Sequence, residues 1–134
     1  MRLRPLKLVL AFIGLLMILT ACNQDSGHSG HDDMLSPLDV KLTVTPTEGK
    51  VNEKISFEAK VTQGGKDIND AKEVTFELWK EGTEKHSKIT VTSTGEGKYV
   101  MVKSFTESGT YHVISHVTAN SQHSMPSADF TVKP

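Results

Sequence analysis

Apolar and polar residues alternate along most of this chain in short segments that end at turn residues, and this pattern limits the possible folds more than any other feature. Successive side chains of a strand point to opposite faces, so such segments predict strands with one face on a core. β-Branched and aromatic residues fill the segments, and no stretch beyond Leu38 has helical periodicity. The pattern occurs seven times, at residues 38–45, 55–61, 74–79, 89–91, 99–105, 111–117 and 128–132.

Seven short strands of this kind predict an all-β fold, an immunoglobulin-like antiparallel β-sandwich. A small β-barrel is the alternative. Gly109-Thr110-Tyr111 opens the sixth segment and resembles the tyrosine corner of such sandwiches. We expect the fifth and sixth segments to pair as a hairpin, and Trp79 to cover the core at the end of its strand. Because Cys22 is the only cysteine, the domain has no disulfide and must be stabilised by its core.

The chain begins with a basic head and an apolar run that ends in small residues. Arg2, Arg4 and Lys7 precede the apolar run at 8–19, and Leu19-Thr20-Ala21-Cys22 closes it. This order is typical of a secretory signal peptide, and its end looks like a bacterial lipobox, in which Cys22 is acylated and becomes the first residue after cleavage. The run is shorter than the roughly 20 residues of a spanning helix, and a retained transmembrane helix is the alternative.

Three regions follow from these patterns. Residues 1–21 are predicted to be a lipoprotein signal peptide, residues 22–37 the lipidated Cys22 and a flexible polar tether, and residues 38–134 the β-sandwich domain. Acyl chains on Cys22 would anchor the protein to the extracytoplasmic face of a bacterial cell membrane. We expect the domain to be a monomer.

Charge and composition exclude several functional classes. Cleavage would remove three of the fifteen basic residues and none of the sixteen acidic ones, which leaves a net charge of −4 with no basic cluster. Nucleic-acid binding is not expected, because it requires a concentrated positive surface. The domain has no cysteine nucleophile, nucleophile elbow or phosphate-binding loop, so we expect no enzymatic activity.

Histidine and methionine are the residues that point to chemistry. Alternation places His112 and His116 on the outward face of the sixth segment, because Tyr111, Val113 and Val117 form the better core face. The candidate metal ligands are His116, His123, Met125, Met101 and His86.

These candidates have ordinary explanations as well. An imidazole on a strand surface is usually solvated, Met101 can simply fill the core between Tyr99 and its neighbours, and His28 and His31 lie in the predicted tether. Whether the two tether histidines also capture metal stays open. Imidazole and thioether without thiolate suit Cu(I), and imidazole also accepts Cu(II), whereas zinc prefers His, Cys and carboxylate. The predicted cofactor is therefore copper.

Two stretches resemble YtkA-like domains, which are related to FixH-like proteins. They are Gly109 to Ala119 followed by His123-Ser124-Met125-Pro126, and the upstream residues 74–82 with 97–99. FixH-like proteins are associated with the assembly of haem–copper oxidases, so the resemblance implies a role in copper handling. Lipoprotein members of the family also carry a lipobox and a short tether.

A second resemblance is to copper chaperones of the PCu(A)C type. Met101, twenty-one intervening residues, His123 and Met125 match the later part of their motif. Thr90 occupies the position of the first His or Met, and His86, four residues earlier, is the candidate replacement. The resemblance thus implies Met101, His123 and Met125 as ligands and leaves the fourth ligand open.

The sequence predicts a lipid-anchored copper-binding protein outside the cytoplasm that delivers copper to an envelope protein or assists assembly of a respiratory oxidase. The alternative is an immunoglobulin-like interaction module of the envelope that binds a protein partner without metal.

Overall fold

The computed structural model describes residues 36–134 and contains eleven β-strands there. The strands are β1 (Leu38–Thr45), β2 (Glu48–Lys50), β3 (Ile55–Gln63), β4 (Lys66–Asp67), β5 (Glu73–Lys80), β6 (His86–Thr90), β7 (Ser93–Gly95), β8 (Lys98–Lys103), β9 (Gly109–Ala119), β10 (Gln122–Ser124) and β11 (Ser127–Lys133). The predicted signal peptide, Cys22 and most of the predicted tether lie outside the described residues. Residues 36–134 contain no helix of the length and apolarity needed to cross a bilayer.

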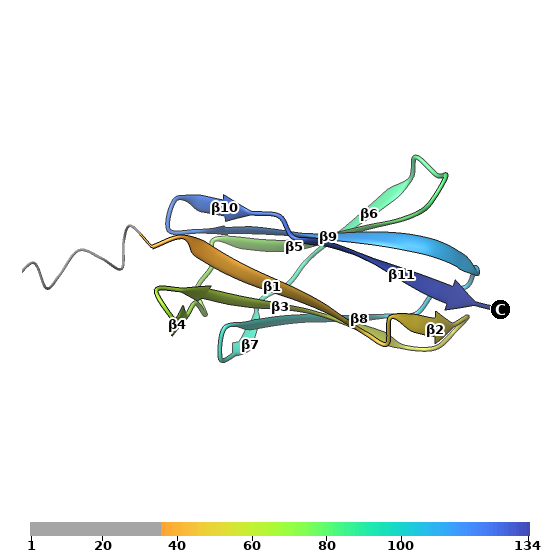
Figure 1. Ribbon diagram of the computed structural model, residues 1–134, viewed down its shortest axis with the longest axis horizontal. Coiled ribbons are helices and arrows are strands. Elements are labelled where there is room, and N and C mark those ends of the chain that lie inside the picture. Colours follow the sequence, from red (N-terminus) through yellow and green to blue (C-terminus); the bar gives the residue numbers. More distant parts are fainter. Residues whose placement is uncertain (1–35) are drawn as a thin grey trace, which may run out of the picture.

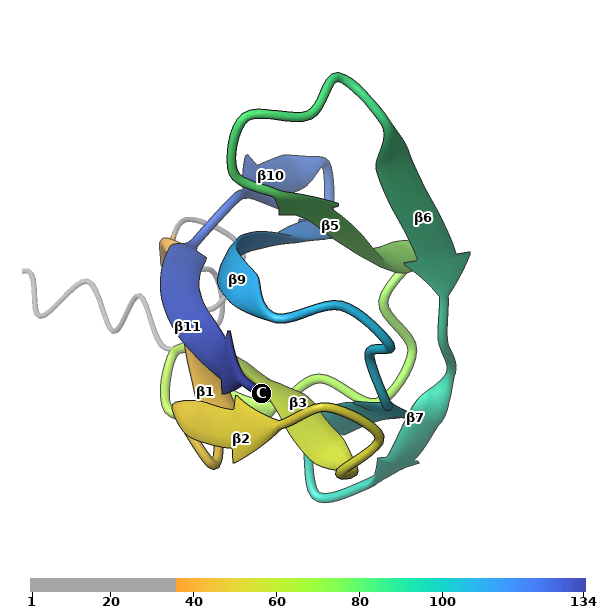
Figure 2. The ribbon, with the colours of Figure 1, turned by 90° about the vertical axis from the view of Figure 1, so that its right-hand side faces the viewer.

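The strands form two sheets that face each other across one core (Figures 1 and 2). The first sheet has the order β1-β3-β8-β7, with β4 paired to β3, and the second has the order β2-β11-β9-β5-β6, with β10 paired to β9. All pairs are antiparallel except β2 with β11. The predicted β-sandwich is confirmed, and its seven principal strands correspond to the seven alternating segments.

The expected hairpin between the fifth and sixth segments is wrong. These segments correspond to β8 and β9, which belong to different sheets. Strand β8 pairs with β3 and β7, whereas β9 pairs with β5, β10 and β11. The residues that connect them, 104–108, pass from one sheet to the other. Alternation identifies which residues of a strand face inward, but it does not identify the sheet to which the strand belongs.

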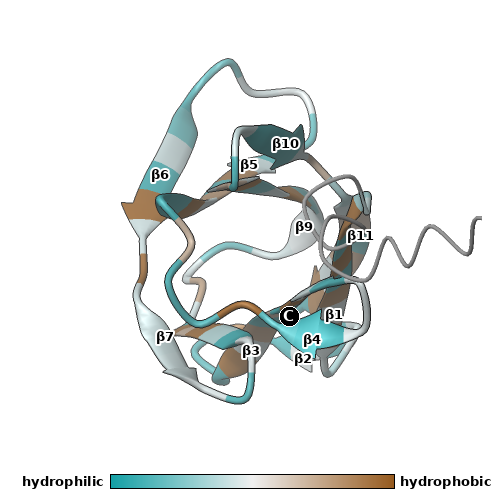
Figure 3. Cartoon of the chain, turned by 90° about the vertical axis from the view of Figure 1, so that its left-hand side faces the viewer, coloured by the Kyte–Doolittle hydropathy of each residue, from teal (hydrophilic) through white to brown (hydrophobic). Residues whose placement is uncertain are grey.

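The core follows the alternation. Buried and partly exposed residues alternate along the whole of β3 and most of β9. Phe57 of β3 contacts Phe76, Phe105 and Phe130 with ring centroids 6.4, 6.4 and 5.1 Å apart, so one aromatic ring joins both sheets. In contrast to these core strands, the short strands β4 and β10 consist of hydrophilic residues (Figure 3).

Tyr111 forms the predicted tyrosine corner. Its hydroxyl donates to the carbonyl oxygen of Glu107, four residues upstream, at 2.8 Å, and its ring is buried between Phe105 and Phe130. This hydrogen bond holds the segment that connects β8 and β9 against the first residues of β9.

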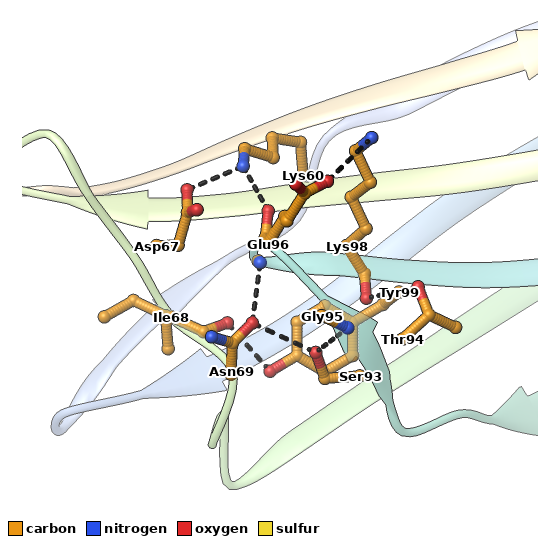
Figure 4. Close-up of polar contacts among 11 residues, drawn as sticks. Lys60, Asp67, Ile68, Asn69, Ser93, Thr94, Gly95, Glu96, Lys98 and Tyr99 are labelled. Atoms are coloured by element: carbon orange, nitrogen blue, oxygen red, sulfur yellow. Dashed lines mark hydrogen bonds and ion pairs between the residues drawn. The ribbon is translucent and has the colours of Figure 1, made fainter.

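A polar network fastens the turn between β7 and β8 to the segment after β4 (Figure 4). The Oδ1 atom of Asn69 accepts from the backbone N–H of Gly97 at 2.6 Å and from the hydroxyl of Ser93 at 3.2 Å. Gly97 has a φ of +68°, and a Cβ at this position would lie 2.5 Å from the carbonyl oxygen of Val61. At position 97, only glycine fits without displacing the backbone.

Candidate functional site

Four of the histidines lie on the outward side of the second sheet. His112 and His116 alternate along β9 with the buried residues Tyr111, Val113 and Val117, as predicted. His86 lies on the edge strand β6 and His123 on β10. Because β6, β5, β9 and β10 are neighbours in that order, the sheet brings together residues from four separate segments of the chain.

Glu77 of β5 lies between two of these imidazoles. Its Oε1 is 2.7 Å from Nδ1 of His86, and its Oε2 is 2.6 Å from Nε2 of His116. The bonds from His86 and His116 lower the pKa of Glu77 below its ordinary value of 4.5, with a further contribution from the charge of Lys88 and against the opposing effect of burial. The carboxyl is therefore ionised at neutral pH and accepts from both rings.

An ionised carboxylate cannot donate, and this fixes the tautomer of each neutral ring. His86 must carry its proton on Nδ1 and His116 on Nε2, which leaves Nε2 of His86 and Nδ1 of His116 with free lone pairs. Carboxylates hold metal-binding histidines in the same way, with the second ring nitrogen directed at the ion. The hydrogen bonds to Glu77 thus leave one nitrogen of each imidazole free to bind a metal ion. The two imidazoles lie on opposite sides of the carboxylate.

A second group surrounds Trp79 on the same face. The ring of His86 stacks on it with centroids 4.5 Å apart and planes inclined by 5°, and the ring of His112 packs at 5.2 Å. Nδ1 of His112 is also 2.6 Å from Oδ1 of Asp129 on β11. The expectation that Trp79 covers the core is wrong, because its neighbours are two imidazoles on the outer face.

His123 and Met125 approach His116 from the side opposite to Glu77. His123 pairs with Thr118, whose hydroxyl lies 2.8 Å from Nδ1 of His123, and its ring centroid is 6.2 Å from that of His116. Met125 falls between β10 and β11, after Ser124, which pairs with Val117, and before Pro126, whose carbonyl oxygen accepts from the N–H of Ser115 at 2.9 Å. This register places Met125 beside His116, and its side chain is 55% exposed.

Met101 does not join this group. It lies on β8 in the first sheet, opposite Phe57, and is buried in the core with 6% of its surface exposed. The second sheet separates it from the outward histidines. Met101 therefore fills the core, and its placement near His123 and Met125 was wrong because it depended on the β8–β9 hairpin.

The structure thus brings together His116 and His123, with Met125 at an adjacent position, and links His86 to His116 only through Glu77. In residues 36–134 no group of three or more His, Cys, Asp and Glu side chains is arranged to hold a metal ion. Sequence reasoning did not identify Glu77. Its outward position in β5 is visible in the alternation, but its two partners are set by strand register, which the sequence pattern does not show.

Comparison with one solved structure supports the fold alone. The chain is similar to the alkylpurine DNA glycosylase AlkC of Pseudomonas fluorescens bound to DNA containing an abasic site analogue, with 14% identity and a TM-score of 0.52 over 74% of this chain and 31% of that chain. This chain therefore spans about a third of the length of that protein. Similarity to the superoxide reductase of Ignicoccus hospitalis has 11% identity and a TM-score of 0.46, over 72% of this chain and 80% of that one.

Comparison by sequence identifies one family. No curated protein matches the chain. The model of the YtkA-like family matches residues 32–116, more than half of the chain, and this range includes β1 to β8, Glu77, His86 and the part of β9 that ends at His116. The chain belongs to the YtkA-like family.

Proposed function

We propose that this protein is a lipid-anchored copper-binding protein that works outside the cytoplasm and passes copper to a partner in the cell envelope. Membership of the YtkA-like family suggests an extracytoplasmic envelope protein. The lipobox-like sequence ending at Cys22 supports attachment to the membrane through acyl chains. The resemblance to FixH-like proteins favours a respiratory oxidase, or its assembly, as the destination of the copper.

The observation that carries the proposal is the closeness of His116 and His123 on an exposed face. Their ring centroids are 6.2 Å apart, and nitrogen–metal bonds are about 2.0–2.1 Å long, so rotation of the side chains allows both rings to bind one ion. Met125 lies beside His116 and supplies a thioether. Two imidazoles and a thioether form a ligand set that favours Cu(I).

Glu77 has a supporting role in this proposal. It accepts from Nε2 of His116 and leaves Nδ1 of that ring free to bind the ion. The same carboxylate lies between His116 and His86, so a common ion for both rings would require it to move away. The geometry therefore favours His86 as a partner of Glu77 and not as the fourth ligand.

Such a site is suited to transfer. Three protein ligands leave the ion accessible, and Met125 is largely exposed, so an incoming protein can replace one donor at a time. A closed four-ligand site on rigid strands would hold copper more tightly and release it more slowly.

An anaerobic Cu(I) titration against a chromophoric chelator tests the proposal. We expect about one Cu(I) per chain, and about tenfold or greater loss of affinity in His123→Ala and in Met125→Leu. His112→Asn is the matched control, because it removes an outward imidazole from the same strand, four positions from His116. X-ray absorption should detect nitrogen and sulfur donors on one ion.

The variants also separate ligands from supporting residues. We expect His86→Ala to leave Cu(I) affinity within about twofold and Glu77→Gln to reduce it by about tenfold. Absence of stoichiometric copper binding, or full binding in both His123→Ala and Met125→Leu, would refute the proposal.

One observation favours the alternative of a metal-independent interaction module. Strand β6 is the terminal strand of its sheet, and four of its five residues are exposed, so its backbone is open to pairing with a strand from another protein. Capture of an envelope protein that persists after loss of His116 and His123 but fails when β6 carries a proline would support this function.

A further inference from the structure

A cavity of about 460 Å³ opens at one end of the sandwich, between the β5–β6 loop and the connection from β8 to β9. Its size falls within the range of small-molecule sites, about 300–1,000 Å³. Short polar side chains line part of its walls, among them Thr83, Ser87, Ser104 and Thr106. None of the proposed copper ligands lines it.

Its apolar lining is formed by side chains that are already fixed by the core. Leu78, Phe105 and Tyr111 line the cavity and are exposed by only 2%, 7% and 7%. The rings of Phe105 and Tyr111 are in contact, with centroids 4.7 Å apart, and the hydroxyl of Tyr111 is held by the carbonyl oxygen of Glu107. The small part of these rings that stays exposed is held rigidly, so contact with an apolar or aromatic group costs the protein little conformational freedom.

The charges of the lining are strongly unequal. It contains three lysines, Lys80, Lys85 and Lys103, and one acidic residue, Glu107. Glu107 is paired with Lys80 at 3.4 Å. Lys85 and Lys103 have no carboxylate partner in the described part of the chain, and the Nζ atom of Lys103 lies 5.8 Å from the centroid of the Phe105 ring. Two cationic groups are therefore available beside an aromatic surface.

We propose that this cavity binds a small organic anion whose carboxylate or phosphate group pairs with Lys85 and Lys103 and whose apolar body rests on Phe105 and Tyr111. The unpaired positive charge selects the anionic group, and the buried rings select the body. A neutral molecule of the same shape gains only the second contribution, and an inorganic anion gains only the first. The proposal does not depend on copper binding.

Titration of the purified full chain with 4-phenylbutyrate tests the proposal. Trp79 is among the lining residues, but its ring packs against His86 and His112 on the outer face of the sheet, so binding is measured by NMR and not by tryptophan fluorescence. Amide chemical shifts in a two-dimensional NMR spectrum locate the ligand. We expect saturable binding with shifts concentrated at residues 83–87 and 103–107, and about tenfold weaker binding of the neutral analogue 4-phenyl-1-butanol.

The double variant K85Q/K103Q removes both charges and keeps side chains of similar shape, and we expect it to bind 4-phenylbutyrate about tenfold more weakly. K41Q/K72Q is the matched control, because both lysines are exposed and lie outside the cavity lining. An unchanged thermal midpoint verifies folding of each variant. The proposal is overturned if binding is not saturable, if the shifts lie elsewhere, if the alcohol binds as well as the acid, or if both double variants bind equally.

Discussion

Replacement of Glu77 by glutamine tests how much the hydrogen bonds between its carboxylate and the two imidazoles contribute to stability. The carboxylate accepts two hydrogen bonds, of 2.7 and 2.6 Å, and its side chain is only 14% exposed, whereas those of His86 and His116 are 37% and 24% exposed. A hydrogen bond to a buried charged group is worth about 1.5–3 kcal/mol, and the exposure of both imidazoles reduces this to about 1 kcal/mol each. A glutamine keeps one acceptor and presents an N–H to the other ring, which must then change its tautomer.

We therefore expect Glu77→Gln to lower the free energy of unfolding by about 1–2 kcal/mol at pH 7. For a domain of about 100 residues this corresponds to a fall in Tm of about 4–8 °C per kcal/mol. Urea unfolding followed by Trp79 fluorescence and by circular dichroism measures the loss. Glu58→Gln is the control, because Glu58 is an outward carboxylate of β3 without a hydrogen-bond or ion-pair partner among residues 36–134.

The pH dependence gives a second, independent readout. The pKa of Glu77 is lower in the folded protein than its ordinary value of 4.5, so its stabilising contribution is complete above pH 4.5 and disappears as the pH falls through the folded pKa. The stability difference between the wild type and Glu77→Gln should shrink over this acid range. Two results would refute the reasoning. One is an equal loss of unfolding free energy in Glu58→Gln at pH 7. The other is a stability difference between the wild type and Glu77→Gln that stays constant as the pH falls well below 4.5.

Three further predictions concern single positions. Ser115 is fully buried and its hydroxyl has no hydrogen-bond partner among residues 36–134, so Ser115→Ala should raise the free energy of unfolding by about 1 kcal/mol in urea titrations. Gly97→Ala should lower it by about 2–3 kcal/mol, because the added Cβ meets the carbonyl oxygen of Val61 at a positive φ; wild-type stability in that variant would contradict the turn geometry. Met101→Leu should change stability by less than about 1.5 kcal/mol and leave Cu(I) affinity unchanged, and weaker copper binding would contradict the placement of Met101 in the core.

Local pattern was sufficient to predict the principal strands and the inward faces. Residues such as Phe57, Val113 and Val117 alternate with polar neighbours, and burial of one face is the main contribution that such a strand makes to folding. Strands β2, β4, β7 and β10 have only two or three residues each, too few to show a period. They form because a neighbouring strand offers unpaired backbone groups, which is a property of the assembled sheet.

The candidate site was predictable only in part, because some of its contacts depend on how the strands assemble into sheets and not on local sequence pattern. His116, His123 and Met125 are close in sequence, and the extended chain that turns back at Asn120 and Ser121 brings them together through a local β9–β10 pairing. Glu77 lies 39 positions from His116 and meets it through β5–β9 register. Met101 was misplaced because sequence proximity of two strands does not determine whether they share a sheet.

The break between β10 and β11 has a consequence for the rate at which the proposed copper site would exchange its ion. Both strands pair along the same edge of β9, and Met125 and Pro126 occupy the gap between them, outside either strand. A thioether carried by this gap can swing away by rotation about its own bonds, on the picosecond-to-nanosecond timescale of exposed side chains. His116 and His123 lie on paired strands, so in the copper site that we propose the ion would leave without separation of any strand pair.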